Sequence, residues 1–255
     1  MKIFRLFACL SVSLLISLSS LALAGDLSLD DLVNKLQANQ SKIHDMYAET
    51  TTQITSNFQS QTSKLSGPQT MVQKGRMWTK GKDKTKVEMI SPMKQIIITN
   101  GDQMMMINPE TGQKVIQDLK KLRESQGMAE SSKQMNLEKA KEFFDLSVQK
   151  LDASKPGDLD TYVITGVPKK ENKFLGKMEL YIDTARWVPV KIYMYDSKGK
   201  LMSRSEIEYQ KGDGGIWAPS KNVSNITTPM GKMDVTMEFN NIKINKGISD
   251  NEFKI

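Results

Sequence analysis

Few residues in this sequence are able to do chemistry, and their spacing argues against a catalytic or metal centre. The chain has one histidine, His44, and one cysteine, Cys9. Metal sites and Ser-His-Asp triads built on imidazole need several such partners held together. The carboxylates mostly alternate with lysines, which is typical of solvated faces and not of a paired acid–base site. We therefore predict no catalytic residue, no metal and no cofactor, and a protein that binds a ligand without reacting with it.

Methionine is the unusual ingredient, with 17 in the chain and Met104, Met105 and Met106 in a row. Because the thioether is flexible and polarizable, a methionine-rich face can adapt to variable apolar partners. The same residues could equally fill an ordinary core. Methionine sulfur also suits Cu(I), but neither cysteine nor histidine accompanies these methionines, which disfavours a copper site. An apolar binding face and simple core filling both stay open.

The first residues have the layout of a secretory signal peptide. Lys2 and Arg5 are followed by an apolar run from Leu6 to Leu21 and by small residues before Gly25. We predict that residues 1–24 are removed by cleavage after Ala24 and that the mature chain, 25–255, is one exported domain. Cleavage removes the cysteine, so the mature chain would form no disulfide.

The formal charge of +7 is spread thinly, with its densest basic cluster between Lys74 and Lys86. The near-alternation of these lysines predicts the solvated face of a strand or hairpin. Nucleic-acid binding would need such a patch to be interleaved with aromatic stacking residues in a cytosolic protein, whereas the first residues predict export, so no nucleic-acid partner is predicted. Attraction to anionic lipid headgroups or to an acidic partner remains the alternative for this cluster.

The elements that would position a binding face alternate between helix and strand. Ser28 can cap a helix, and apolar residues recur near a 3.6-residue period as far as Tyr47, which predicts one amphipathic helix. From Ala48 to Pro109, β-branched residues and short turns predict an antiparallel meander. The charged stretch at about 117–144 predicts two helical pieces that could form a lid.

Strand patterns return after Phe144, and several of them alternate cleanly between apolar and polar residues. The clearest case runs from Lys232 to Phe239. A period of two with one apolar face indicates a half-buried antiparallel sheet. The whole pattern predicts an α+β fold in a single domain.

Two blocks of residues resemble the LolA-like family of outer-membrane lipoprotein-sorting proteins. The first comprises Gly75-Arg76-Met77-Trp78, Pro92, the run from Gln95 to Asp102, and Asn108-Pro109. The second comprises Tyr181-Ile182-Asp183, the run from Trp187 to Lys191, Asp196 to Gly199, and the segment from Phe239 to Phe253. The similarity spans most of the mature chain, although each motif is diffuse.

The resemblance implies a strongly curved antiparallel sheet, an unclosed β-barrel, whose concave apolar face is covered by helices. It implies a periplasmic, monomeric carrier that shelters acyl chains of lipoproteins or lipids between an inner-membrane donor and an outer-membrane acceptor. The alternative is a lipid or lipoprotein sensor, or a regulatory interaction protein, of the same fold. In the family's carriers an arginine on the sheet latches the lid, and Arg76 corresponds to it in this sequence.

With that fold, one face of the strands would line the apolar cavity. The predicted lining residues are Trp78, Met89, Met104, Met106, Leu180, Ile182, Ile192, Met194, Met233, Val235, Met237 and Phe239. Their inward direction is assumed from the alternation along each strand.

Overall fold

The computed structural model describes residues 27–58, 68–125, 137–152, 160–171, 175–228 and 231–255, so the predicted signal peptide lies outside the described residues. Thirteen strands form one antiparallel sheet in the order β6-β5-β4-β3-β2-β1-β13-β12-β11-β10-β9-β8-β7. They are β1 (Asp45–Phe58), β2 (Gln69–Lys80), β3 (Lys84–Ser91), β4 (Gln95–Asn100), β5 (Gln103–Ile107), β6 (Lys114–Asp118), β7 (Phe144–Leu151), β8 (Thr161–Pro168), β9 (Lys177–Asp183), β10 (Val188–Tyr195), β11 (Leu201–Lys211), β12 (Trp217–Thr228) and β13 (Gly231–Ile244).

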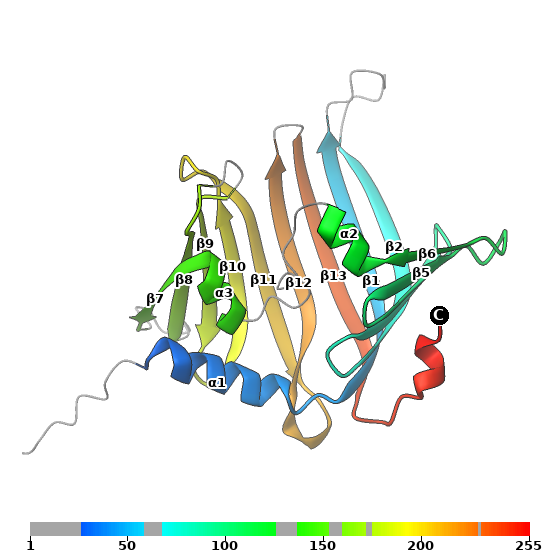
Figure 1. Ribbon diagram of the computed structural model, residues 1–255, viewed down its shortest axis with the longest axis horizontal. Helices are drawn as coiled ribbons and strands as arrows, with labels where there is room; N and C mark the ends of the chain where they lie inside the picture. Colours follow the sequence, from blue (N-terminus) through cyan, green and yellow to red (C-terminus); the bar gives the residue numbers. More distant parts are fainter. Residues whose placement is uncertain (1–26, 59–67, 126–136, 153–159, 172–174, 229–230) are drawn as a thin grey trace, which may run out of the picture.

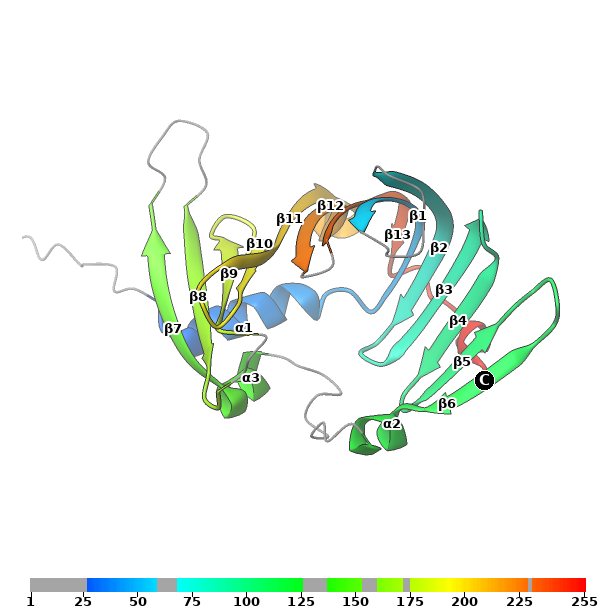
Figure 2. The same cartoon turned by 90° about the horizontal axis from the view of Figure 1, so that it is seen from above.

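The sheet bends into an arch that stays open (Figures 1 and 2). β6 and β7 form its two edges and do not pair with each other in the described part of the chain. This confirms the predicted antiparallel, unclosed sheet. The described helices are α1 (Leu29–Gln40), α2 (Leu119–Ser125) and α3 (Leu137–Phe143), with 3₁₀ turns at Asp213–Gly215 and Asp250–Phe253.

The first helix begins where the sequence predicts and ends early. The Ser28 hydroxyl oxygen accepts from the Asp31 amide at 3.2 Å, and the Asp31 carboxylate accepts from the Ser28 amide at 3.3 Å, a reciprocal cap. The predicted extension to Tyr47 is wrong, because α1 ends at Gln40 and β1 begins at Asp45. Apolar residues near this boundary recur every two residues, as in a strand. Positions four residues apart in such a pattern also fit the spacing of a helix.

Strand pairing shows which side chains share a face of the sheet. Ile164, Leu180, Ile192, Ser205 and Ser224 are successive partners across β8 to β12, and the last two hydroxyl oxygens lie 2.7 Å apart. We call the face that carries this row the inner face and the opposite one the outer face. The same pairing continues from β12 to β6 and assigns every strand residue to one of them.

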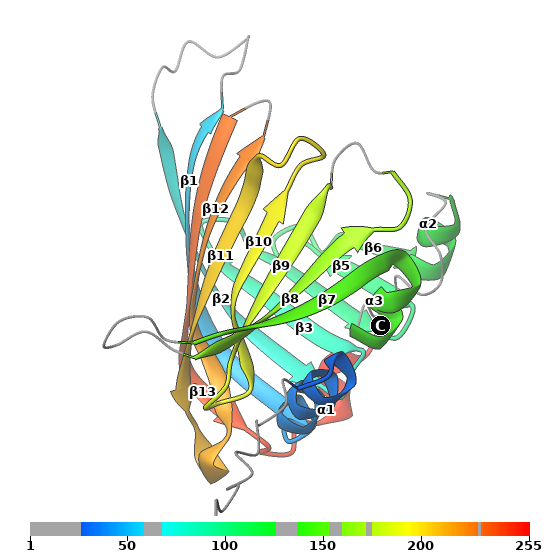
Figure 3. The ribbon, with the colours of Figure 1, turned by 90° about the vertical axis from the view of Figure 1, so that its left-hand side faces the viewer.

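Helix α1 packs on the inner face near the β7 edge. Leu32 and Leu36 form a buried cluster with Tyr162, Ile164 and Ile182 of β8 and β9. Figure 3 shows α1 and α3 on the same side of β7. The helix therefore covers one end of the arch only, from the inside.

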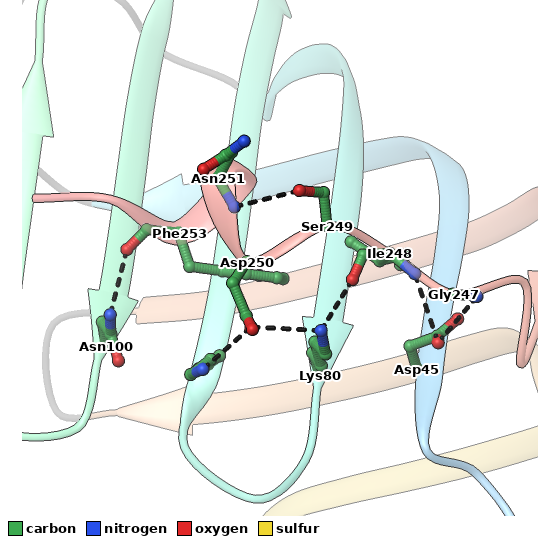
Figure 4. Close-up of polar contacts among 10 residues, drawn as sticks. Asp45, Lys80, Asn100, Gly247, Ile248, Ser249, Asp250, Asn251 and Phe253 are labelled. Carbon is green, nitrogen blue, oxygen red and sulfur yellow. Dashed lines mark hydrogen bonds and ion pairs between the residues drawn. The ribbon is translucent and has the colours of Figure 1, made fainter.

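The chain after β13 crosses the outer face at the other end of the arch. Phe253 is fully buried against Ile98 and Met105 of β4 and β5. Asp250 accepts from Lys84 Nζ at 2.9 Å and lies 3.1 Å from Lys80 Nζ (Figure 4). The lysines predicted to form a solvated face thus partly bind this tail, residues 246–253.

Candidate functional site

An apolar pocket of about 430 Å³ lies between α1, α3 and the inner face of β7 to β10. Its volume is within the range of about 300–1,000 Å³ that is usual for small-molecule sites. The lining residues are Val33, Leu36, Gln37, Gln40, Ala140, Phe144, Leu146, Ile164, Gly166, Leu175, Met178, Leu180, Pro189, Ile192 and Met194.

Contacts at the start of α1 hold the helix above the sheet. The amide of Leu27 donates to the Tyr162 hydroxyl at 3.3 Å, and the Tyr162 ring stacks on Trp187 with ring centres 6.3 Å apart. Lys35 Nζ lies 4.4 Å from the centre of the Trp187 ring, a cation–π contact. Because Lys35 is on α1, this contact helps to set the orientation of the helix over the pocket.

A polar link joins the two helices that border the pocket. Lys141 of α3 forms an ion pair with Asp30 of α1, and Lys169 Nζ donates to the Lys141 carbonyl at 2.6 Å. Ala140, the neighbour of Lys141, is buried and lines the pocket. The link is exposed to water, so it contributes little to stability and leaves the helices able to separate.

Gly166 keeps the floor of the pocket low. A Cβ at this position would lie 3.1 Å from Leu146 Cδ2 and 3.2 Å from Met178 Cγ. Any side chain there would therefore push its neighbours or enter the pocket. The absence of a side chain on β8 makes room for a ligand between β7 and β9.

The pocket has almost no polar character. Among the described residues that line it, Gln37 and Gln40 carry the only polar side chains, and none is ionisable. Such a surface can hold hydrocarbon by burial but supplies neither a nucleophile nor an acid–base pair.

A polar network lies on the outer face of β9 and β10, away from the pocket. Glu179 accepts from Lys177 Nζ at 2.8 Å, from Tyr195 Oη at 3.0 Å and from Tyr181 Oη at 3.1 Å. Burial alone would raise the pKa of Glu179, but these hydrogen bonds lower that pKa below its ordinary value. Burial, and then the bond to Glu179, raise the pKa of Tyr181 to about 12. Glu179 is thus ionised at neutral pH and has its donors in place, as expected of a structural network.

The predicted lining residues share a face, with one exception, but do not form one site. Leu180, Ile192 and Met194 line the pocket. Ile182 lies in the buried cluster beneath α1. The pairing assigns the others on the inner face to the middle and far end of the arch, namely Met89, Met104, Met106, Met233, Val235, Met237 and Phe239.

Trp78 and Arg76 lie on the outer face, one residue out of phase with the predicted cavity. Trp78 packs in the cluster that contains Phe253. Arg76 pairs with Glu88, with Nη1 and Oε2 3.7 Å apart. The sequence alone does not show which face of β2 is inward, because Gly75 lies between the polar residues Lys74 and Arg76 and the nearby β4 and β5 are apolar on both faces. The strand pairing decides it. The contacts of Arg76 place it away from α1 and α3, where a latch would act.

The sequence patterns used above do not identify the helix side of the pocket. Val33, Leu36, Gln37 and Gln40 recur at helical spacing, which places them on one side of α1. Two of the four are glutamines, so an apolar periodicity search overlooks that side. Leu146 and Ile164 show strand alternation in β7 and β8 and could have been found by the same reasoning that identified β9 and β10.

The described residues contain no group of three or more His, Cys, Asp or Glu side chains able to hold a metal ion. Within the same part of the chain, every helix is too short or too polar to span a bilayer.

Comparisons with known proteins give the following matches. A family model described as "Uncharacterized protein" matches residues 136–255. No curated protein matches the sequence. A DUF1329 family protein from Desulfovibrio piger is similar in structure, with a TM-score of 0.60 and 15% identity over 88% of this chain and 95% of that chain.

Two further solved structures are similar over nearly the whole chain. A LolA superfamily protein from Nitrosomonas europaea has a TM-score of 0.56 and 13% identity, covering 90% of this chain and 98% of its own. A structure from Vibrio parahaemolyticus, described as an outer membrane lipoprotein-sorting protein domain, has a TM-score of 0.56 and 15% identity, covering 87% and 95%. The chain therefore has the LolA-like fold, which confirms the resemblance at the level of the fold.

Proposed function

We propose that this chain of LolA-like fold is a non-enzymatic periplasmic carrier. It binds the hydrocarbon chains of lipoproteins or lipids in the pocket between α1, α3 and β7 to β10. It takes them from a donor at the inner membrane and moves them toward an acceptor at the outer membrane. The signal-peptide layout of residues 1–24 supports export, and the similarity to the outer membrane lipoprotein-sorting protein domain from Vibrio parahaemolyticus supports this class of cargo.

The observation that carries the proposal is the pocket's lining. Thirteen of its fifteen residues are apolar, and the two polar ones are uncharged. Each methylene group removed from water contributes about 0.8 kcal/mol, so an acyl chain gains strongly from such a site. No directional bond is needed for this gain, which suits cargo that has to be released again.

Helices α1 and α3 are the proposed cover of the pocket. Val33 and Leu36 of α1 and Ala140 of α3 contribute apolar surface to it. The exposed pair of Asp30 and Lys141 joins the two helices without burying charge. Separation of α3 from α1 would open the pocket. Of the predicted lid at about 117–144, residues 126–136 lie outside the described residues.

Binding of a neutral fluorescent probe, N-phenylnaphthylamine, tests this function. Ile192→Trp fills the pocket and is expected to weaken probe binding by about tenfold or more. Val167→Trp is the matched control, because Val167 is 44% exposed on the outer face of β8, next to Gly166. Equal probe affinities of these two variants and the unmodified protein would overturn the assignment of the pocket.

The cargo itself is accessible by mass spectrometry of lipid extracted from protein purified from its host. A lipid that is retained by the unmodified protein and lost from Ile192→Trp supports the carrier. A stable membrane partner that co-purifies with lipid-free protein would instead favour the sensor.

A further inference from the structure

We infer that the pocket selects hydrocarbon chains with an uncharged, hydrogen-bonding head group, such as an ester or amide, over chains that end in a free carboxylate. Gln37 and Gln40 are the residues that would recognise this head group. The inference rests on the proposed function and names the class of ligand that the same site accepts.

The polar end of the pocket is at the last turn of α1. Gln37 and Gln40 are three residues apart and therefore lie on one side of the helix. Leu36 is buried, whereas Gln40 is exposed, which places the mouth of the pocket at Gln40. A chain lying along the apolar lining would therefore have its head beside two neutral amides.

Neutral amides can recognise an ester or amide but cannot balance a carboxylate. A glutamine side chain donates through its nitrogen and accepts through its oxygen, so it can pair with a carbonyl oxygen or with an amide N–H. A carboxylate that loses water without meeting a cation is strongly disfavoured. In the part of the lining that the structure describes, no lysine, arginine or histidine compensates for that loss.

The backbone of α1 adds to this preference. Gln40 is the last residue of the helix, where the carbonyl groups carry the negative end of the helix dipole. The last turn has no basic residue to offset this negative end. The field at the mouth therefore opposes an anion. Lys42 follows the helix but is not part of the lining.

The lysine described on α3 near the pocket is already paired. Lys141 binds Asp30, which is seven residues before Gln37 on α1. With a helical rise of about 1.5 Å per residue, this ion pair lies roughly 10 Å along the helix from Gln37. Lys141 is thus placed to join the helices and not to receive a head group at the mouth.

Displacement of N-phenylnaphthylamine by three ligands of equal chain length tests the inference. The ligands are dodecanoate, methyl dodecanoate and dodecanamide, compared at about pH 8, where the carboxyl group is ionised. We expect the affinities for the ester and the amide to exceed the affinity for dodecanoate by about tenfold or more. In the double variant Gln37→Leu and Gln40→Leu, the ratio of dodecanamide affinity to probe affinity is expected to fall several-fold.

A charge added at the mouth separates recognition by Gln40 from the general preference of an apolar pocket for neutral ligands. Gln40→Lys is expected to lower the ratio of ester to carboxylate affinity by about tenfold, because it supplies the missing cation. Ala38→Lys is the control, since Ala38 is exposed near the same end of α1 but outside the lining.

The outcomes distinguish the inference from the proposed function. Equal binding of dodecanoate and methyl dodecanoate by the unmodified protein, or the same change in both lysine variants, would overturn the inference and leave the carrier intact. Failure of all three ligands and the probe to bind would overturn the proposed function and the inference with it.

Discussion

The two ends of the arch are covered on opposite faces, and an apolar pocket lies beneath the cover at one of them. Near the β7 edge, α1 packs on the inner face and leaves the pocket between itself and β7 to β10. Near the β6 edge, the tail packs on the outer face, with Phe253 fully buried against Ile98 and Met105. A similar segment-on-sheet contact thus produces a binding site at one end and a closed core at the other.

The cause of this difference is the size and position of a few side chains. Gly166 leaves the floor of the pocket without a side chain, and the helix above it bears Gln37 and Gln40 on the side facing the opening. The tail instead inserts a phenylalanine between Ile98 and Met105. One cover therefore leaves a pocket beneath it, and the other packs closely on the sheet.

The largest expected effect on the free energy of unfolding is at the tail, residues 246–253. Phe253→Ala leaves a cavity beneath the tail and should lower the free energy of unfolding by about 3–5 kcal/mol, measured by urea denaturation. Probe binding by the folded variant should be unchanged, because Phe253 is remote from the pocket. Loss of probe binding with the fold intact would show that the two ends of the arch are coupled and do not act independently.

A smaller loss of stability is expected at α1. Leu36→Ala should lower the free energy of unfolding by about 2–3 kcal/mol, because one side of Leu36 already borders the pocket and has fewer contacts to lose. The enlarged pocket should also change probe affinity by about threefold or more. A variant destabilised to this extent with unaltered probe affinity would remove α1 from the binding site.

Acid should loosen the tail. Hydrogen bonds from Lys84 and then Lys80 lower the pKa of the exposed Asp250 below its ordinary value. Its contribution is therefore complete above about pH 4, the ordinary pKa of aspartate, and is lost as the pH falls through the lower folded value. Amide exchange of residues 248–253 should rise over that window, and Lys84→Met should flatten the change. Equal acid responses of the two proteins would contradict this role for Asp250.

The smallest expected effects distinguish Arg76 from Lys141 as the residue that keeps the pocket closed. Arg76 and Glu88 form an exposed pair, so Arg76→Ala should change the free energy of unfolding by about 0–1 kcal/mol and leave probe release unaltered. Lys141→Met breaks the link between α3 and α1 and should speed probe release severalfold in stopped-flow measurements. Faster probe release from Arg76→Ala, with no change in Lys141→Met, would instead assign the latch to Arg76.

Sequence reasoning succeeded where one face of a strand is apolar and the other is wet. The alternation in β9 and β13 correctly indicates half-buried antiparallel strands, and Leu180, Ile192 and Met194 do line the pocket. It failed in phase at Trp78, because the strands near the tail have apolar residues on both faces. The runs Gln95–Asn100 and Gln103–Ile107 show this directly, since their apolar residues are nearly continuous and neighbouring ones lie on opposite faces.

The composition and local patterns of the chain by themselves determined an α+β protein with an antiparallel sheet and a capped first helix. These features depend on neighbours within a few residues, through alternation, helical spacing and caps. The tertiary structure alone decided which end of the arch is hollow. That outcome depends on contacts between distant segments, α1 with β8 and the tail with β4, and on whether a side chain or an empty position meets them.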